Sequence, residues 1–252
     1  SGNGGAIDLD AGGDITTQDL YSLSSSSSGN LGNGGAIDLD AGGDITTQYL
    51  YSRSYSRSGN SGNGGDITLN AKTIKFNSPQ HANGEKIKIN TFSVGKKESE
   101  EGKGGDVNIT TNNLSNTEIL TLSSHSKSGK VTIESKTQEP LQIEYSSIVT
   151  SEQVTITMPW GRKIQFETGD TQSGDISINS SGDLNLNNVI IQSDTKSNQN
   201  AGNVNINSSG QISLNSTKIL STAEAKGNAG NITIITPQKI ELTNNSTLQA
   251  DT

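Results

Sequence analysis

The stretch Gly202-Asn203-Val204-Asn205-Ile206-Asn207 sets a pattern that recurs along the whole chain. A glycine and a small polar residue precede a short alternation of aliphatic and polar residues, as again in Gly230-Asn231-Ile232-Thr233-Ile234. This alternation predicts a β-strand with one buried face. The first aliphatic residue of each copy lies at position 7, 37, 67, 107, 131, 154, 176, 204 or 232. One short strand that returns at such intervals is typical of a solenoid, whose coils bury each other's apolar faces.

Each repeat contains two further aliphatic segments, so three strands and three faces are expected per coil. In the last three coils the second strand carries Leu184/Leu186, Ile212/Leu214 and Ile240/Leu242, and the third carries Ile191, Leu220 and Leu248. The sequence therefore predicts an all-β fold, a single-stranded, three-faced parallel β-helix of about nine coils.

We interpret the chain as one β-helical segment, 1–252, whose coils fall into four groups. Residues 1–62 form two 30-residue coils, and 3–22 differs from 33–52 only at Asp19 versus Tyr49. Residues 63–106 form a coil with a looped insertion, 107–175 form short coils, and 176–252 form regular 28-residue coils. Because the chain starts at a repeat boundary and stops as a coil closes, we expect a segment of a longer array, with further repeats as its end-to-end partners.

Composition narrows the possible functions. Only 28% of the 252 residues are hydrophobic, which suits a narrow coil with few inward-facing residues. No cysteine is present, so neither a disulfide nor a thiolate metal site is expected. The net charge of −8 argues against a nucleic-acid partner, and no apolar run predicts membrane insertion.

Alternation predicts which side chains of the second coil's third strand point outward. If Leu50 points into the coil, Ser52, Ser54, Ser56 and Ser58 also point inward. The outward strip would then consist of Tyr49, Tyr51, Arg53, Tyr55 and Arg57. Tyrosine and arginine are enriched at interfaces, so this strip could bind glycans or pack against a neighbouring rod, or be ordinary surface. Trp160, in a turn, is a second candidate contact residue.

Six aspartates on the first two coils are candidate metal ligands. They are Asp8, Asp10, Asp14, Asp38, Asp40 and Asp44. Carboxylates stacked on adjacent coils repel each other, and Ca²⁺, which prefers several oxygen ligands, would relieve that repulsion. The alternative is a solvated acidic ladder without a cofactor, because calcium-binding β-rolls have glycine where Ile7 and Ile37 stand here.

The sequence offers no catalytic residues. A glycoside hydrolase needs carboxylates that converge across one groove, and the acidic residues here belong to a duplicated repeat. His81 and His125 lie in separate coils, in polar loop-like contexts. A polysaccharide lyase or hydrolase is therefore the least favoured class, after a structural or adhesive rod and a carbohydrate-binding module.

The repeats Asn200-Ala201-Gly202-Asn203-Val204-Asn205-Ile206-Asn207 and Gly227-Asn228-Ala229-Gly230-Asn231-Ile232-Thr233-Ile234 resemble those of filamentous-haemagglutinin-type exoproteins of two-partner secretion, especially the long cyanobacterial ones. The second half-repeat, 239–250, is similar too. The resemblance covers all the coils. It implies a right-handed β-helical fibre, exported through a partner β-barrel and located at the cell surface, that serves in adhesion, surface coating or motility-related filaments.

Overall fold

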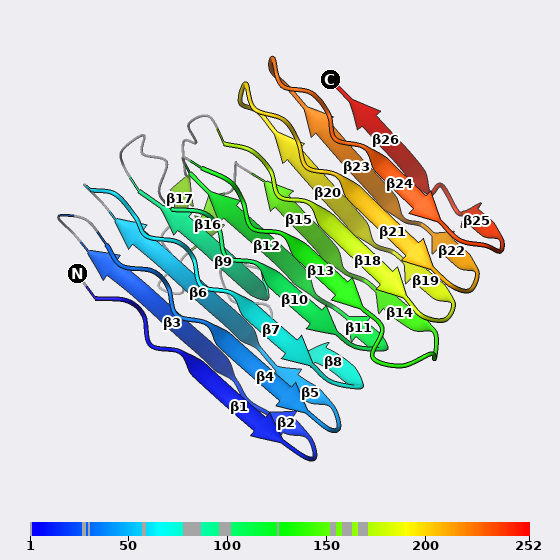
Figure 1. Cartoon of the computed structure of the whole chain (residues 1–252), viewed down its shortest axis with the longest axis horizontal. Helices are drawn as coiled ribbons and strands as arrows, with labels where there is room; N and C mark the ends of the chain where they lie inside the picture. Colours follow the sequence, from blue (N-terminus) through cyan, green and yellow to red (C-terminus); the bar gives the residue numbers. More distant parts are fainter. Residues whose placement is uncertain are drawn as a thin grey trace.

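Three parallel β-sheets run along a common axis, and the coils of the chain stack along that axis. The computed structural model describes residues 2–26, 29, 31–56, 59–77, 87–95, 102–124, 126–151, 155–157, 163–165 and 171–252. Successive strands visit sheets A, B and C in turn, so each coil of chain adds one strand to every sheet (Figure 1). A three-faced parallel β-helix is therefore confirmed.

The strands of the three sheets share one order along the rod. Sheet A contains β1 (Ile7–Ala11), β4 (Ile37–Ala41), β7 (Ile67–Asn70), β10 (Val107–Thr110), β13 (Val131–Glu134), β18 (Ile176–Ser180), β21 (Val204–Ser208) and β24 (Ile232–Ile235). Sheet B contains β2 (Ile15–Thr16), β5 (Ile45–Thr47), β8 (Thr73–Phe76), β11 (Asn113–Ser115), β14 (Leu141–Glu144), β19 (Leu184–Asn187), β22 (Ile212–Asn215) and β25 (Ile240–Thr243). Sheet C contains β3 (Asp19–Ser26), β6 (Tyr49–Ser56), β9 (Ile89–Val94), β12 (Glu118–Ser123), β15 (Ser147–Ser151), β20 (Ile190–Thr195), β23 (Lys218–Ala223) and β26 (Thr247–Asp251).

These sheets have eight strands each, so the described chain forms eight coils rather than nine. The segment expected to start an additional coil forms β16 (Thr155–Thr157) instead, which pairs antiparallel with β17 (Lys163–Gln165). Val131 in β13 pairs directly with Ile176 in β18. The hairpin is therefore an insertion between coil five, which ends with β15, and coil six, which begins with β18.

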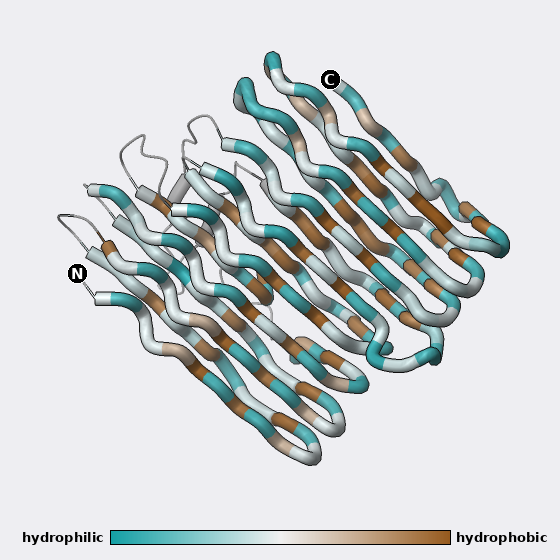
Figure 2. The backbone as a smooth tube through the Cα atoms, in the orientation of Figure 1, coloured by the Kyte–Doolittle hydropathy of each residue, from teal (hydrophilic) through white to brown (hydrophobic). Residues whose placement is uncertain are grey.

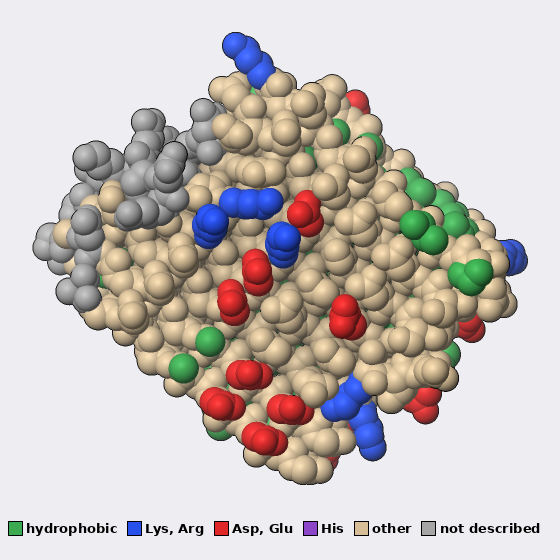
Figure 3. Space-filling view, viewed as in Figure 1, with side chains coloured by type: hydrophobic (Ala, Val, Ile, Leu, Met, Phe, Trp, Pro, Cys, Tyr) green, Lys and Arg blue, Asp and Glu red, His purple; other side chains and the backbone are tan. Residues whose placement is uncertain are grey.

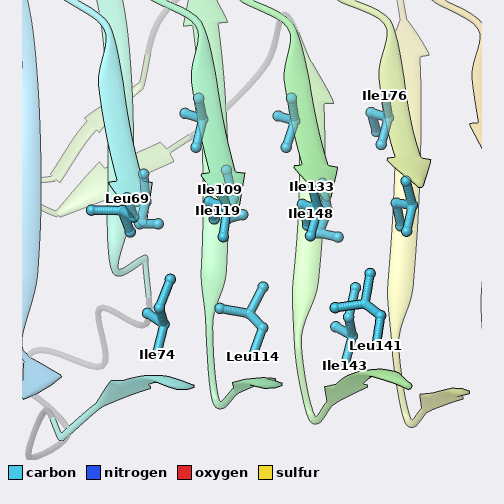
Figure 4. Close-up of a cluster of buried hydrophobic side chains, with 14 of the residues drawn as sticks. Leu69, Ile74, Ile109, Leu114, Ile119, Ile133, Leu141, Ile143, Ile148 and Ile176 are labelled. Carbon is cyan, nitrogen blue, oxygen red and sulfur yellow. The ribbon is translucent and has the colours of Figure 1, made fainter. Parts of the chain in front are cut away.

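The aliphatic columns of sheets A and B form the core. Ile7, Ile37, Ile67, Val107, Val131, Ile176, Val204 and Ile232 lie in one register, and the residues two positions later form a second column. The predicted strand positions are thus confirmed, except that Ile156 lies in the antiparallel hairpin and Val154 lies outside the described residues. Figure 2 shows these columns as apolar bands across the coils, and Figure 4 shows the side chains stacked inside. Full burial of each such side chain contributes roughly 1.5–3 kcal/mol.

Sheet C contributes one aliphatic column. Its members are Leu20, Leu50, Ile89, Ile119, Ile148, Ile191, Ile219 and Leu248. The expectation that Leu220 belongs to this column is wrong, because Ile219 is buried in that register and Leu220 is its outward-facing neighbour.

Beyond that column, sheet C packs against a glycine-rich strip of backbone. Here the inward positions are serine or threonine, and we call this two-layer region the flap. The first hydroxyl column is Ser22, Ser52, Thr91, Thr121, Thr150, Ser193 and Ser221. Ser52 shows the arrangement: its hydroxyl donates to the Gly35 carbonyl at 2.7 Å and accepts from the Gly65 amide at 2.9 Å. The flap thus replaces aliphatic packing with hydrogen bonds between coils.

Glycine is required in the flap because successive coils approach closely there. A Cβ on Gly105 would overlap the carbonyl of Gly65, and one on Gly174 would overlap the carbonyl of Gly129. Ser52, Ser54 and Ser56 are buried inside this layer. The predicted inward orientation of these serines is confirmed, and Ser58 lies outside the described residues.

Asparagine and aspartate continue the hydrogen-bond ladder at the corners between sheets. The side-chain oxygen of Asn203 accepts the backbone N–H of Asn231 at 2.9 Å, and Asp175 does the same for Asn203. At the corner between sheets B and C, coils four to seven each have one residue with positive φ, such as Asn116 at 54° and Asn188 at 53°, and coil eight has two. Asparagine tolerates this left-handed conformation, which explains its frequency in these repeats.

Candidate functional site

The acidic ladder lies on the outer face of sheet A at the N-terminal end of the rod. Asp8 pairs in register with Asp38, and Asp10 with Asp40. Alternation directs all four carboxylates away from the core, and they are exposed. Figure 3 shows acidic side chains gathered over this end of the face. Partial loss of solvent around Asp38, and then the charges of Asp8 and Asp40, raise the pKa of its carboxyl above its usual value.

The two remaining aspartates of the predicted metal site lie at the corner between sheets A and B. The carboxylate of Asp14 accepts the backbone N–H of Asp44 at 2.9 Å, so it serves the corner ladder. The amide of Asn70 donates to Asp40 at 3.0 Å, which gives that carboxylate a neutral partner. Across the described ranges, no three His, Cys, Asp or Glu side chains are grouped so that they could hold a metal ion. Calcium binding stays a prediction, and the arrangement is that of a solvated ladder.

The aromatic strip of β6 points away from the coil interior, as predicted, but most of it is buried. Tyr49 and Tyr51 are each 1% exposed and Arg53 is 5% exposed, while Tyr55 is half-buried. The expectation of an exposed strip is therefore wrong for the first three. Arg57 and Trp160 lie outside the described residues.

Ring and cation contacts connect these buried side chains. The guanidinium carbon of Arg53 lies 3.9 Å from the ring centre of Tyr51 and 4.6 Å from that of Phe92 in β9. The Tyr51 hydroxyl donates to the carbonyl of Ile87 at 2.9 Å, and the ammonium of Lys88 lies 4.9 Å from the Tyr49 ring. These contacts join the outward side chains of β6 to β9 and to the two residues before it, which lie beside β6 in the same sheet.

These residues belong to a second apolar layer outside sheet C. Its other members are Phe92, Val94, Leu120 and Leu122, all outward-facing and buried. Alternation could have identified them, because apolar residues occupy outward positions on three successive coils. Asn90 is fully buried in the same layer, and no partner for its amide atoms occurs among the described residues. The layer is a packed structure, not an open binding surface.

The open edge of coil eight is the most exposed apolar region of the described chain. Ile240, Leu242 and Leu248 are 42%, 43% and 44% exposed, whereas their counterparts in coil seven, Ile212, Leu214 and Ile219, are buried. Figure 3 shows hydrophobic side chains on the surface at this end of the rod. The opposite end exposes Leu9, although Leu39 one coil further in is buried. An unpaired strand edge of this kind can pair with another strand.

Comparison with protein-family models, with curated proteins and with solved structures finds no match to this chain. The part of the chain that the structure describes contains no helix that is long and apolar enough to cross a membrane.

Proposed function

We propose that this protein is a structural segment of a secreted cell-surface fibre, in which a β-helical rod provides length and display for adhesion, surface coating or motility-related filaments. The main support is the regular stack of the eight described coils in three parallel sheets, in which each repeat adds length to a rod and none of these repeats is set apart as a site. The resemblance of the repeats to filamentous-haemagglutinin-type exoproteins supports the cell-surface location and export by two-partner secretion.

The proposal assigns no catalytic step to the chain. The carboxylates of coils one and two stand in parallel columns on one outer face, and a hydrolase would require carboxylates that converge on one bond. A carbohydrate-binding role loses its main candidate residues, because Tyr49, Tyr51 and Arg53 are buried.

A rod that supplies length should lengthen in proportion to added coils. One, two or three copies of 196–223 inserted after Ala223 should each extend the particle by about 4.8 Å in solution scattering. The same variants should retain no specific glycan on an array and should leave pectin and alginate intact. Secretion would be checked by fractionating cells of the source organism and locating the protein with an antibody.

Specific retention of one glycan would favour a binding module, and depolymerisation would favour an enzyme. Inserted coils that leave the maximum dimension unchanged would contradict the rod itself.

A further inference from the structure

Asparagine is followed directly by glycine at one equivalent position in each of the first three coils. The pairs are Asn3-Gly4, Asn33-Gly34 and Asn63-Gly64, each starting four positions before a strand of sheet A. A fourth pair, Asn83-Gly84, lies outside the described residues. Asparagine before glycine is especially prone to deamidation, because glycine has no side chain to hinder attack by its backbone nitrogen. The glycine strip therefore begins, in these coils, with a chemically labile pair.

Deamidation requires two groups of such a pair to be free. The glycine nitrogen loses its proton and bonds to the side-chain carbonyl carbon of the asparagine. The bond from that carbon to the amide nitrogen breaks, and ammonia leaves with the proton. Water then opens the cyclic imide and yields aspartate or isoaspartate. A hydrogen bond donated by the glycine N–H opposes loss of its proton, and a hydrogen bond accepted by the side-chain oxygen holds the carbonyl group in place.

The next coil engages both of these groups. The N–H of Gly34 donates to the carbonyl of Asn63 at 2.8 Å, and the side-chain oxygen of Asn33 accepts the N–H of Asn63 at 2.9 Å. One coil further on, the N–H of Gly64 donates to the Lys103 carbonyl, and the side-chain oxygen of Asn63 accepts the Lys103 N–H, both at 2.9 Å. Both glycines are buried, although both asparagines are exposed to water. Each pair is therefore closed by the coil that follows it.

Coil seven provides a matched comparison. Asn200 stands four positions before its sheet A strand, as Asn33 does, but the residue after it is Ala201. The side-chain oxygen of Asn200 accepts the N–H of Asn228 at 2.9 Å, and the N–H of Ala201 donates to the carbonyl of Asn228 at 2.9 Å. The hydrogen bonds to the next coil are thus equivalent, and the residue that sets the chemical lability differs.

The two products of deamidation would affect the coil differently. Aspartate keeps a side-chain oxygen that can accept the N–H of the next coil, as Asp175 does for Asn203 at 2.9 Å. Isoaspartate routes the main chain through the former side chain and so adds a carbon atom to the backbone. The residues after it are then displaced relative to the neighbouring coil, and the register of the strand is lost. A coil that carries isoaspartate would not restack as before.

We propose that Asn33 and Asn63 are modification sites that deamidate only when their coil separates from the next one, so that an opening of the rod becomes a permanent chemical change. In the closed stack the hydrogen bonds to the next coil keep each pair intact. In the opened state each pair reacts with water as it would in a free chain. The rate at each site then follows the free energy of opening of one junction between coils.

Mass spectrometry of peptide fragments can follow deamidation of each asparagine in the full chain. The chain is incubated at mildly alkaline pH, once folded and once in denaturant, and Asn33, Asn63 and Asn200 are compared. In denaturant, Asn33 and Asn63 should react at least about tenfold faster than Asn200, because only they precede glycine. The variant Ala201→Gly should bring Asn200 to their rate in denaturant. In the folded chain all three glycine-linked sites should react at least about tenfold more slowly than in denaturant.

Two further variants test whether one junction controls one site. Ser52→Ala removes the hydroxyl that accepts the Gly65 N–H between coils two and three, and Ser221→Ala is its counterpart between coils seven and eight. In the folded chain, Ser52→Ala should speed deamidation of Asn33 at least about threefold and change the rate at Asn63 by less than about twofold. Ser221→Ala should change neither rate.

Three results would overturn the proposal. One is deamidation of Asn33 and Asn63 as fast in the folded chain as in denaturant. Another is fast deamidation of Asn200 in folded Ala201→Gly, which would show that these hydrogen bonds do not protect the pair. The third is equal acceleration at Asn33 by Ser52→Ala and Ser221→Ala, which would assign the reaction to global unfolding. If Ser52→Ala does not fold, the first two comparisons still decide the proposal.

Discussion

The aliphatic columns of sheets A and B and the hydroxyl columns of the flap fill the same coil by different means. Ile133 and Ile178 pack as apolar side chains between neighbours of the same kind. In the flap, Thr121 and Ser193 form hydrogen bonds with the backbone of the glycine strip. The aliphatic region is stabilised by burial, which has no direction, and the flap by bonds that require specific geometry. The flap should therefore tolerate far less change in shape, and the aliphatic region far less change in polarity.

A buried charge should produce the largest effect. Ile178→Asp places a carboxylate between Ile133 and Ile206, where the described core has no cation to pair with it. We expect a loss of at least about 5 kcal/mol in the free energy of unfolding, enough to prevent folding. The matched control is Ser177→Asp on the outer face of the same strand, which should fold normally. Normal circular dichroism and melting of Ile178→Asp would contradict the register.

Adding a single methyl group in the flap should have the next largest effect on stability. Gly174→Ala introduces a Cβ that overlaps the Gly129 carbonyl, and backbone cannot move aside as a side chain can. We expect a loss of about 3 kcal/mol, measured by denaturant unfolding. Gly12→Ala is the control, since a Cβ there meets nothing within 4 Å. Equal stability of the two variants would show that the flap is not closely packed.

Removing one hydroxyl without changing shape should have a smaller effect. Thr121→Val keeps the volume but deletes the 2.7 Å bond to the Gly129 carbonyl, leaving a buried acceptor unsatisfied. The expected loss is about 1–3 kcal/mol. Thr132→Val on the outer face of sheet A should change stability little. If Thr121→Val were neutral or stabilising, the flap would depend on packing, as the aliphatic region does.

A substitution on the outer face should have the smallest effect on stability, and it gives a reference for the effects in the two interior regions. Partial loss of solvent and the charges of Asp8 and Asp40 raise the pKa of Asp38, so folding favours its protonated form. The resulting stabilisation is present in acid and is lost as pH rises through the raised pKa. Asp38→Asn should therefore raise the melting temperature slightly at neutral pH and have little effect at pH 3. An equal gain at both pH values would contradict an electrostatic cause.

The aliphatic columns of sheet A could be predicted because each has one spacing and one residue type. The prediction of a ninth coil was wrong because Val154-Thr155-Ile156 has the same alternation as the strands of sheet A. The glycine strip distinguishes the strands of sheet A from this segment. Gly129 lies two positions before Val131, and Gly174 two positions before Ile176, but Glu152 lies two positions before Val154. A side chain there would overlap the carbonyl of the coil below, which only the close approach in the structure reveals.

The candidate site was less predictable than the fold. The outward orientation of Tyr51 followed from alternation, but its burial, and the bond from its hydroxyl to the Ile87 carbonyl, involve residues far away in the sequence. At positions 219 and 220, two adjacent aliphatic residues led to the wrong choice of Leu220 as the inward one. Ser221 resolves it, because its hydroxyl must face the Gly230 amide. Long-range covering of a face has no local signal, whereas a column of hydroxyls has one.

The hydrogen bonds between coils have a mechanical consequence. They run along the rod, so tension between its two ends pulls each coil directly away from its neighbour. The bonds of one coil would then open in sequence, and the rod should peel one coil at a time from an exposed edge. A coil of the spacing from Val204 to Ile232, 28 residues, releases about 95 Å of extended chain. Under load, such a rod would lengthen in regular steps and absorb work at each one.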